Sequence, residues 1–331
     1  MVATTTLKKI SEMLSISIST VSRALKNHPD ISEKTKQKVN DLATMLDYEP
    51  NPHAIQLSSK TSNVLGVIVP KVSDLFYTSF IDAVEEESRK HGYSLIILKT
   101  DNNAEVEINH VKFCKKQRVA GLFASVTPDT TNLDAFERLK EVEIPVIFYD
   151  RVPTTDKFTR ACFADRNAAI LAAETILKKK KKKVLAIFGD THISITQQRM
   201  QAFKEVFKQH KVSNRLVIKH ANNYLESNDA VLAQINSGEI PDTIFCMSDE
   251  ILVGAMKALQ IKNLNVPKDV SVITISNGFY PQLYHPEITY VETSGYKLGK
   301  LAFEIMIKAI AGDKHIQEYD VEPLLIEGGS L

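Results

Sequence analysis

The chain has 331 residues and a mass of 37.0 kDa, which is enough for roughly two domains, each with a core of its own. Hydrophobic residues make up 44% and charged residues 24%, and 41 basic side chains against 40 acidic ones leave a formal charge of +1. This composition excludes a disordered chain and a wholly basic one. Cys114, Cys162 and Cys246 lie far apart, and none has a second Cys or a His at metal-ligand spacing. We therefore expect no disulfide framework, no metal site and no cofactor.

The N-terminal residues contain no apolar run long enough for a signal peptide, and no stretch of about 18 uninterrupted apolar residues occurs. We expect a cytoplasmic protein with no membrane partner. Residues 1–60 hold eight Lys or Arg against six Asp or Glu, a net charge of +2, and the remainder has a net charge of −1. Because polyphosphate binding usually needs a stronger basic bias, charge by itself is a weak indication of nucleic-acid binding.

Three short helices are predicted between residues 6 and 47. Thr6, Ser17 and Ser32 are placed to cap them, and a tight connection separates the first two. The inward stripes are Leu7, Ile10, Met13 and Leu14, then Val21, Ala24 and Leu25, then Val39, Leu42, Ala43 and Leu46. Three short helices joined in this way are typical of a helix-turn-helix unit.

From residue 62 onward, strand-like and helix-like segments alternate. Buried strands are predicted at 64–69, 94–98, 120–125, 145–149, 184–188, 243–247 and 270–275. This succession indicates parallel sheets covered by helices on both faces, divided into two lobes, and 150–163 is the expected first crossing between them. The lysine run 178–183 is interpreted as a solvated turn between a helix and a strand rather than as a nucleic-acid site.

The segment from Thr6 to Leu57 resembles the DNA-binding headpiece of the lactose/galactose-repressor family of bacterial transcription regulators. The matching features are Ser-Thr-Val-Ser-Arg-Ala-Leu at 19–25, Ile31-Ser32, Lys34-Thr35, Tyr48-x-Pro50 and Leu57. Similar segments continue along the chain at 64–70, 144–151, around Arg199, at 248–259 and at 266–277.

The resemblance implies an α/β protein with an N-terminal three-helix helix-turn-helix headpiece plus hinge, then a two-lobed periplasmic-binding-protein-like core with parallel sheets. The expected boundaries are 1–49 for the headpiece, 50–61 for the hinge helix and linker, and 62–331 for the effector-binding and dimerisation core. Members of this build are homodimers, and two symmetric headpieces match a near-palindromic operator in double-stranded DNA.

The second helix of the headpiece presents outward residues that suit the major groove. Ile18 and Ser19 lie at its start and are candidate base readers, and the planar fork of Arg23 suits bidentate contact with guanine. By resemblance Thr6, Thr20, Ser22 and Lys26 face phosphates. The alternatives are core packing for Ile18 and an ion pair with a carboxylate for Arg23.

The hinge, Pro50 to Leu57, is too short to be stable as an isolated helix. By resemblance, paired hinge helices enter the minor groove and Leu57 wedges between base steps, with Asn51 and Ala54 also at the DNA. The alternative for Leu57 is packing against the core.

Resemblance places an effector between the lobes, at the carboxyl ends of the strands. The candidate residues are Ser73, Phe76, Asp150, Phe163, Arg199, Ser248, Asp249 and Ser276. Their acceptors, donors and apolar faces suit a polyhydroxylated ligand, with Arg199 as first anchor and Asp150 as second. A sugar acid or oligosaccharide is one form of that expectation. For Asp249 the alternative is the N-cap of a helix at 250–259.

The function expected is therefore a transcriptional regulator, a repressor, controlled by a carbohydrate. A purine, a phosphosugar or a protein co-effector stays open as the controlling partner. A solute-binding protein without DNA function would leave the headpiece unexplained. An enzyme is disfavoured, because no Gly-x-Gly-x-x-Gly motif follows the strand at 64–69 and no Walker-type loop occurs.

Overall fold

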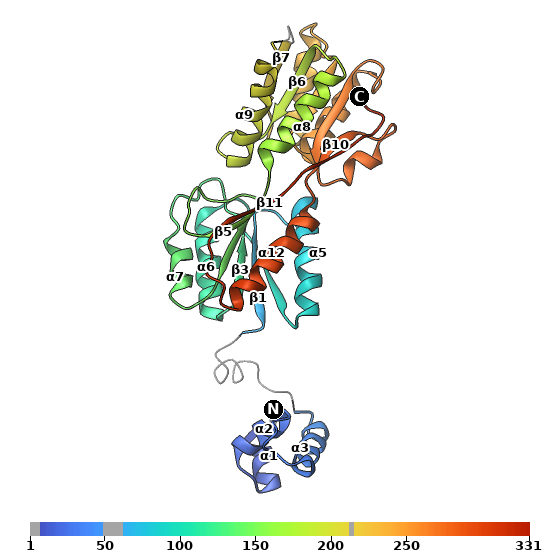
Figure 1. Ribbon diagram of the computed structural model, residues 1–331. Helices are drawn as coiled ribbons and strands as arrows, with labels where there is room; N and C mark the ends of the chain where they lie inside the picture. The colour runs from blue at the N-terminus through green and yellow to red at the C-terminus, as the bar shows by residue number, and fades with distance from the viewer. Residues whose placement is uncertain (1–6, 49–61, 212–214) are drawn as a thin grey trace. The chain divides into compact units, whose positions relative to one another are not determined.

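A computed structural model describes residues 7–48, 62–211 and 215–331, and divides the chain into two compact units, Met1–Ser62 and Asn63–Leu331. Among its described residues, 7–48 and 62, the first unit contains three helices, α1 (Leu7–Leu14), α2 (Ile18–Leu25) and α3 (Glu33–Met45) (Figure 1). Ser17 caps α2 and Ser32 caps α3, each accepting a hydrogen bond from the backbone N–H three residues on.

The three helices enclose a small core of Ile10, Val21, Ala24, Val39 and Ala43. The predicted stripes are thus confirmed except at Met13, whose side chain is 52% exposed. Met13 lies about 100° around the helix from its neighbour Leu14, outside the arc that packs on the other helices.

The second unit contains two six-stranded sheets, one in each of two lobes (Figure 1). The sheet of lobe 1 has the order β11-β5-β4-β3-β1-β2 and is parallel throughout. Its strands are β1 (Val64–Val69), β2 (Ser94–Lys99), β3 (Gly121–Ala124), β4 (Val146–Tyr149), β5 (Thr159–Phe163) and β11 (Glu318–Val321).

The sheet of lobe 2 has the order β12-β10-β9-β8-β6-β7 and is parallel except for β12, which runs antiparallel to β10. Its strands are β6 (Lys183–Phe188), β7 (Arg215–His220), β8 (Thr243–Cys246), β9 (Ser271–Ser276), β10 (Thr289–Glu292) and β12 (Leu324–Ile326). All seven predicted strands occur within two residues of their expected bounds. β5, β7, β10, β11 and β12 were not predicted.

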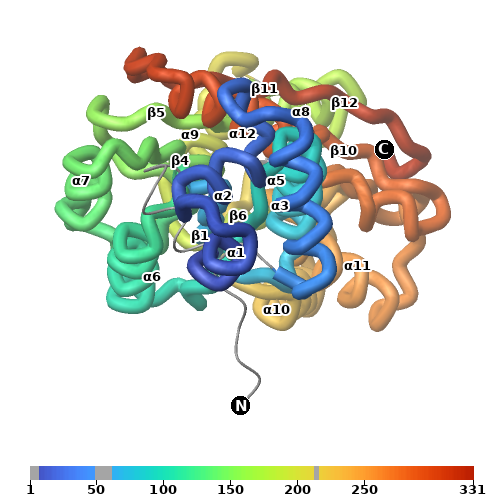
Figure 2. Tube along the Cα trace, turned by 90° about the horizontal axis from the view of Figure 1, so that it is seen from below, coloured from blue at the N-terminus to red at the C-terminus, as the bar shows by residue number. Residues whose placement is uncertain are grey.

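Alternate residues of the lobe 1 strands pack on opposite layers of helices. Leu65, Val67 and Val69 face α5 (Leu75–Lys90) and α12 (Gly295–Ile310), whereas Ile68 faces α6 (Ala104–Gln117) and α7 (Asp134–Lys140). The pair α5 and α12 lie side by side in both views (Figures 1 and 2). A Cβ on Gly295 would lie 2.2 Å from the carbonyl oxygen of Phe76, so only glycine permits this close approach.

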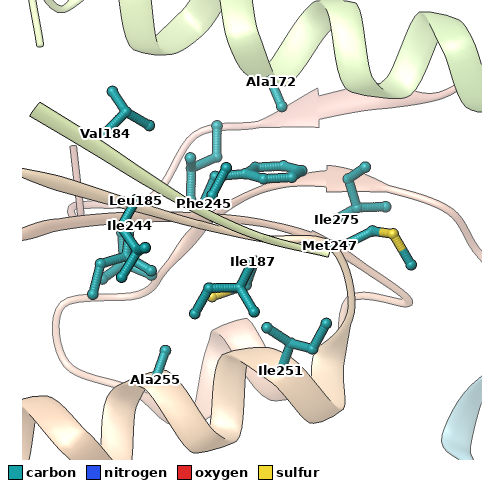
Figure 3. Close-up of a cluster of buried hydrophobic side chains, with 14 of the residues drawn as sticks. Ala172, Val184, Leu185, Ile187, Ile244, Phe245, Met247, Ile251, Ala255 and Ile275 are labelled. Atoms are coloured by element: carbon teal, nitrogen blue, oxygen red, sulfur yellow. The ribbon is translucent and has the colours of Figure 1, made fainter. Parts of the chain in front are cut away.

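Lobe 2 is covered by α8 (Asp165–Lys178), α9 (Ser194–Gln209), α10 (Tyr224–Asn236) and α11 (Asp249–Ile261). Figure 3 shows its core, in which Ala172 of α8 and Ile251 of α11 approach the sheet from opposite faces around Phe245 and Ile187. The lysine run lies at the end of α8, where Lys178 to Lys180 are exposed, as expected for a solvated turn.

The chain crosses between the lobes three times, after β5, between β10 and α12, and between β11 and β12. The expected crossing within 150–163 is wrong, because β5 pairs with β4 and β11 and so belongs to lobe 1. No helix in the described part of the chain is long and apolar enough to cross a membrane.

Candidate functional site

The outward face of α2 carries the predicted base readers. Val21 and Ala24 are buried in the headpiece core, which turns the opposite face to solvent. Ile18 is 47% exposed, so core packing does not account for it. Ser19 and Arg23 are exposed beside it.

A cluster of hydroxyl groups lies at the N-terminus of α2. The Ser17 hydroxyl is 2.8 Å from the hydroxyls of both Ser19 and Thr20, and it accepts from the Thr20 backbone N–H at 3.1 Å. Backbone N–H groups and the helix dipole make such a terminus favourable for a phosphate.

Arg23 has a carboxylate neighbour, as the alternative interpretation required. Its Nη1 lies 4.0 Å from Asp30 Oδ2, and both side chains are more than half exposed. A solvent-exposed pair at this distance contributes little stability. The guanidinium is therefore available to a stronger acceptor. Lys26 is exposed at the C-cap of α2, and Ser22 is half-buried.

Four predicted DNA-contacting residues lie outside the described residues, namely Thr6, Asn51, Ala54 and Leu57.

A cleft of about 430 Å³ opens between the lobes of the second unit. It is lined by residues that follow the carboxyl ends of β1, β4, β6, β8 and β9, the edge at which parallel α/β sheets bind ligands. Seven of the eight predicted effector residues line it, which are Ser73, Phe76, Asp150, Arg199, Ser248, Asp249 and Ser276.

Phe163 does not line this cleft. It is 6% exposed, belongs to the lobe 1 core, and has its ring 6.1 Å from that of Phe76 in an edge-on arrangement. Phe163 borders a separate cavity of about 130 Å³ instead. As the last residue of β5, it packs inward with its strand.

Asp150 follows β4 in the left-handed region, with φ 57°. Its Oδ2 accepts a hydrogen bond of 2.6 Å from the Tyr77 hydroxyl, whose oxygen is 3.2 Å from that of Ser125. Burial raises the pKa of Asp150 to about 6, although Arg151 and the Tyr77 hydrogen bond lower it. The carboxylate is thus held in one orientation at the wall of lobe 1.

Asp249 is not the N-cap of α11. Ser248 occupies the cap position, and Asp249 instead accepts hydrogen bonds from the Ser276 hydroxyl and, at 3.0 Å, from the Asn277 backbone N–H. Burial raises the pKa of Asp249 to about 6, and the Ser276 bond partly offsets this. Ser276, the last residue of β9, therefore orients the carboxylate of Asp249, which follows β8.

Arg199 is engaged within the protein. Its Nη2 and Nε lie 2.6 and 2.7 Å from Asp165 Oδ1, and its Nη1 donates to the Met247 carbonyl at 3.0 Å. The side chains of Arg199 and Asp165 are 9% and 7% exposed. The charge of the first expected anchor is therefore neutralised by a carboxylate 34 residues away in the sequence.

Two sets of contacts join the lobes beside the cleft. The side-chain amide oxygen of Asn277, Oδ1, accepts from the Ser79 hydroxyl at 3.1 Å and from the Gly295 N–H at 2.8 Å. Lys71, after β1, lies 3.6 Å from Glu250 of α11. These contacts depend on how closely the lobes approach.

Several lining residues were not predicted. Tyr224 at the start of α10, Tyr280, Asp190 and Arg151 also line the cleft. So does Thr196, whose fully buried hydroxyl oxygen has no hydrogen-bond partner among the described residues. Asp190 and Arg151 follow the strands β6 and β4, so their positions after predicted strands were the available signal. Tyr224 follows β7, which was not predicted.

Comparisons with known proteins agree with this geometry. Residues 62–325 match the family model described as periplasmic binding proteins and sugar binding domain of LacI family, and residues 6–51 match bacterial regulatory proteins, lacI family.

Among sequence relatives, the HTH-type transcriptional repressor PurR of Vibrio atlanticus (strain LGP32) is 26% identical over 98% of each chain. The ribose operon repressor of Halalkalibacterium halodurans is 26% identical over 92% of this chain and 90% of its own.

Among solved structures, the Lac repressor dimer bound to operator and the anti-inducer ONPF has a TM-score of 0.87 at 19% identity, covering 98% of each chain. This similarity shows the shared fold. The match of the core model to most of the chain, together with the headpiece match, identifies the chain as a member of the LacI family of bacterial DNA-binding transcriptional regulators.

Proposed function

We propose that this protein is a repressor whose operator binding is controlled by a carbohydrate in the interlobe cleft. The observation that carries the proposal is the pair of oriented carboxylates, Asp150 from lobe 1 and Asp249 from lobe 2, that line one cleft. Carboxylates accept hydrogen bonds from neighbouring hydroxyls, and a ligand held from both lobes favours one lobe arrangement over another.

In this proposal α2 reads the operator. Ile18, Ser19 and Arg23 contact base edges, because they occupy the exposed face of the helix. Thr20, Ser22 and Lys26 contact phosphates around them and set the register. Thr6 joins that phosphate set by resemblance to the family.

The remaining assignments extend the same proposal. The protein acts in the cytoplasm as a homodimer without catalysis, and its operator is near-palindromic. The boundaries 1–49, 50–61 and 62–331 separate headpiece, hinge and core. Asn51, Ala54 and Leu57 contact the minor groove in the hinge, so Leu57→Ala should reduce DNA bending and leave ligand binding intact.

A purine is the second candidate for the ligand. Relatives named PurR match nearly the whole chain, and Phe76, Tyr224 and Tyr280 place aromatic rings at the cleft. Carbohydrate remains the first choice because two oriented carboxylates, which accept hydrogen bonds from hydroxyl groups, line the cleft.

The DNA-binding part is tested with duplexes selected from random sequence by the full chain. Arg23→Ala should weaken the selected duplex by about 1–3 kcal/mol and relax preference at one base pair in each half-site. Lys26→Ala should weaken selected and random duplexes alike and reduce the salt dependence. Equal losses on both duplexes for Arg23→Ala would contradict its role as a base reader.

The ligand part is tested by thermal shift of the full chain against neutral monosaccharides, disaccharides and purine bases, since a ligand that binds the folded state raises Tm. A stabilising sugar should then change affinity for the selected duplex. Stabilisation by a purine base without any response to sugars would replace carbohydrate by purine in the proposal.

A further inference from the structure

We infer that the cleft binds an uncharged, hydroxyl-rich ligand and discriminates against anionic ones such as phosphosugars and sugar acids. This inference rests on the proposed carbohydrate control and narrows the chemical class of the ligand. It also argues against the sugar acid, anchored by Arg199, that the sequence offered beside an oligosaccharide as one form of the ligand.

Carboxylates outnumber cations on the cleft wall. Five acidic residues line it against three basic ones, namely Asp74, Asp150, Asp190, Asp249 and Glu250 against Lys71, Arg151 and Arg199. Asp165 adds a sixth carboxylate directly behind Arg199. An anion entering this space meets an excess of like charge, at short range and partly shielded from water.

Each cation is already committed to a group of the protein. Lys71 pairs with Glu250 at 3.6 Å, and Arg199 pairs with Asp165 at 2.6 Å. Arg151 Nη1 donates to the side-chain amide oxygen of Asn102 at 2.8 Å and lies in the field of Asp150, Asp74 and Asp190. A phosphate or carboxylate ligand would therefore have to break the ion pair of Lys71 or of Arg199, or compete at Arg151 with the Asn102 amide oxygen and the nearby carboxylates.

The carboxylates, in contrast, keep capacity for hydroxyl donors. A carboxylate offers about four lone-pair positions. The Asp150 carboxylate accepts from Tyr77, and that of Asp249 accepts from Ser276 and Asn277. These bonds orient the two groups and leave lone pairs for a ligand, which can donate hydroxyl protons to both lobes at once.

Thr196 of α9 also belongs to the cleft wall, with its hydroxyl oxygen fully buried and without a hydrogen-bond partner among the described residues. Apolar surface from Ile195, Met247 and Tyr224 completes the wall for the C–H faces of such a ligand.

The experiment measures dissociation constants by calorimetry with the full chain and matched probes. One set is glucose, glucose 6-phosphate and glucuronate; a second is galactose with its 6-phosphate and galacturonate; a third is ribose and ribose 5-phosphate. In at least one set the neutral sugar should bind, and its anionic partners should bind at least about tenfold more weakly.

A charge variant tests the cause of this discrimination. Asp190→Asn removes one lining carboxylate and should reduce the ratio of neutral to anionic affinity by about threefold. Glu304→Gln removes a carboxylate from the exposed side of α12, outside the cleft, and should leave the ratio unchanged.

The outcomes separate this inference from the proposed function. An anionic sugar that binds as tightly as its neutral partner overturns the inference, while carbohydrate control of the repressor stands. Absence of binding by every sugar, neutral or anionic, overturns both. If the ratio of neutral to anionic affinity is unchanged in Asp190→Asn, repulsion by the lining carboxylates is not the cause of the discrimination.

Discussion

The buried pair between Arg199 and Asp165 makes stability, as well as ligand response, sensitive to substitution in the cleft. Arg199→Met keeps the apolar stem but leaves Asp165, whose side chain is 7% exposed, without its counter-charge. Loss of one partner from a buried pair costs about 3–5 kcal/mol. Asp165→Asn should cost about 1–3 kcal/mol, because the amide oxygen can still accept from the guanidinium.

The double variant Arg199→Met with Asp165→Asn is the informative one. It contains no uncompensated buried charge, so we expect it to lose only about 1–3 kcal/mol, mainly the hydrogen bond to Met247 and reduced packing. Independent effects would instead add to about 4–8 kcal/mol.

The free energy of unfolding is measured in urea by far-UV circular dichroism, since the chain has no tryptophan. Arg166→Met is the matched control. Its guanidinium pairs with Glu205 at 2.6 Å, but both side chains are at least 40% exposed, so the loss should stay below about 1 kcal/mol.

The pH dependence gives the pair a second signature. Burial raises the pKa of Asp165 while Arg199 lowers it, so removing the guanidinium raises that pKa further. A raised carboxyl pKa makes the folded state hold its proton, and stability then falls as pH rises. The deficit of Arg199→Met should therefore be larger at pH 8 than at pH 5. Additive losses, or a deficit independent of pH, would refute the assignment of a coupled buried pair.

Two further predictions concern buried carboxylates. Glu107 is 1% exposed and accepts from the Thr127 N–H and the Thr130 hydroxyl through different oxygens, so Glu107→Gln should cost about 1–3 kcal/mol in urea unfolding. If Glu107→Gln loses no free energy of unfolding relative to the wild type, the segment that contains Thr127 and Thr130 does not depend on the Glu107 carboxylate. Burial raises the pKa values of Asp150 and Asp249 to about 6. Their contribution to the stability of the ligand-free protein is therefore present below about pH 4 and is lost as pH rises through 6. Affinity for a hydroxyl-rich ligand should instead increase about tenfold or more from pH 5 to 7.5, because both carboxyl groups ionise over this range. Calorimetry at several pH values checks the affinity, and a flat profile would exclude both groups as acceptors.

Much of the fold could be predicted because short apolar runs in the sequence mark the strands that are buried. Apolar runs such as 64–69 and 184–188 are buried on both faces of parallel sheets, and each became a strand. Strands such as β11, Glu-Tyr-Asp-Val, carry no such signal. β11 becomes a strand because the chain returns to the edge of lobe 1 and pairs with β5, a contact between segments more than 150 residues apart.

The cleft also has features that the sequence predicts and features that it does not. The positions of Asp150, Arg199 and Asp249 follow from motifs, and the structure brings all three to one cleft. Their hydrogen-bond partners do not follow, because Asp165 and Ser276 come from elements distant in sequence. These hydrogen-bond partners determine the chemistry of the cleft. Asp165 neutralises Arg199, which the sequence predicted as an anchor for the ligand. Ser276 orients Asp249 as an acceptor, where the alternative prediction was a helix cap.

The ion pair between Lys71 and Glu250 offers a way to test how the cleft is coupled to DNA binding. The two residues come from different lobes, so their 3.6 Å contact exists only in arrangements that bring the lobes together here. Both side chains are at least 41% exposed, and such a pair contributes up to about 1 kcal/mol, or about fivefold in an equilibrium between lobe arrangements.

Lys71→Glu replaces attraction by repulsion across the cleft rim and should change ligand affinity and operator affinity by related factors, because coupling between two sites is reciprocal. Adding Glu250→Lys reverses the pair and should restore both affinities at low salt. Fluorescence anisotropy with the selected duplex, with and without ligand at two ionic strengths, measures these changes. If Lys71→Glu alters ligand affinity but leaves the ligand's effect on DNA affinity unchanged, the pair acts on binding alone. Lobe closure would then have to be governed by the hydrogen bonds of the Asn277 side chain with Ser79, Gly295 and the Leu75 carbonyl, which also join the lobes.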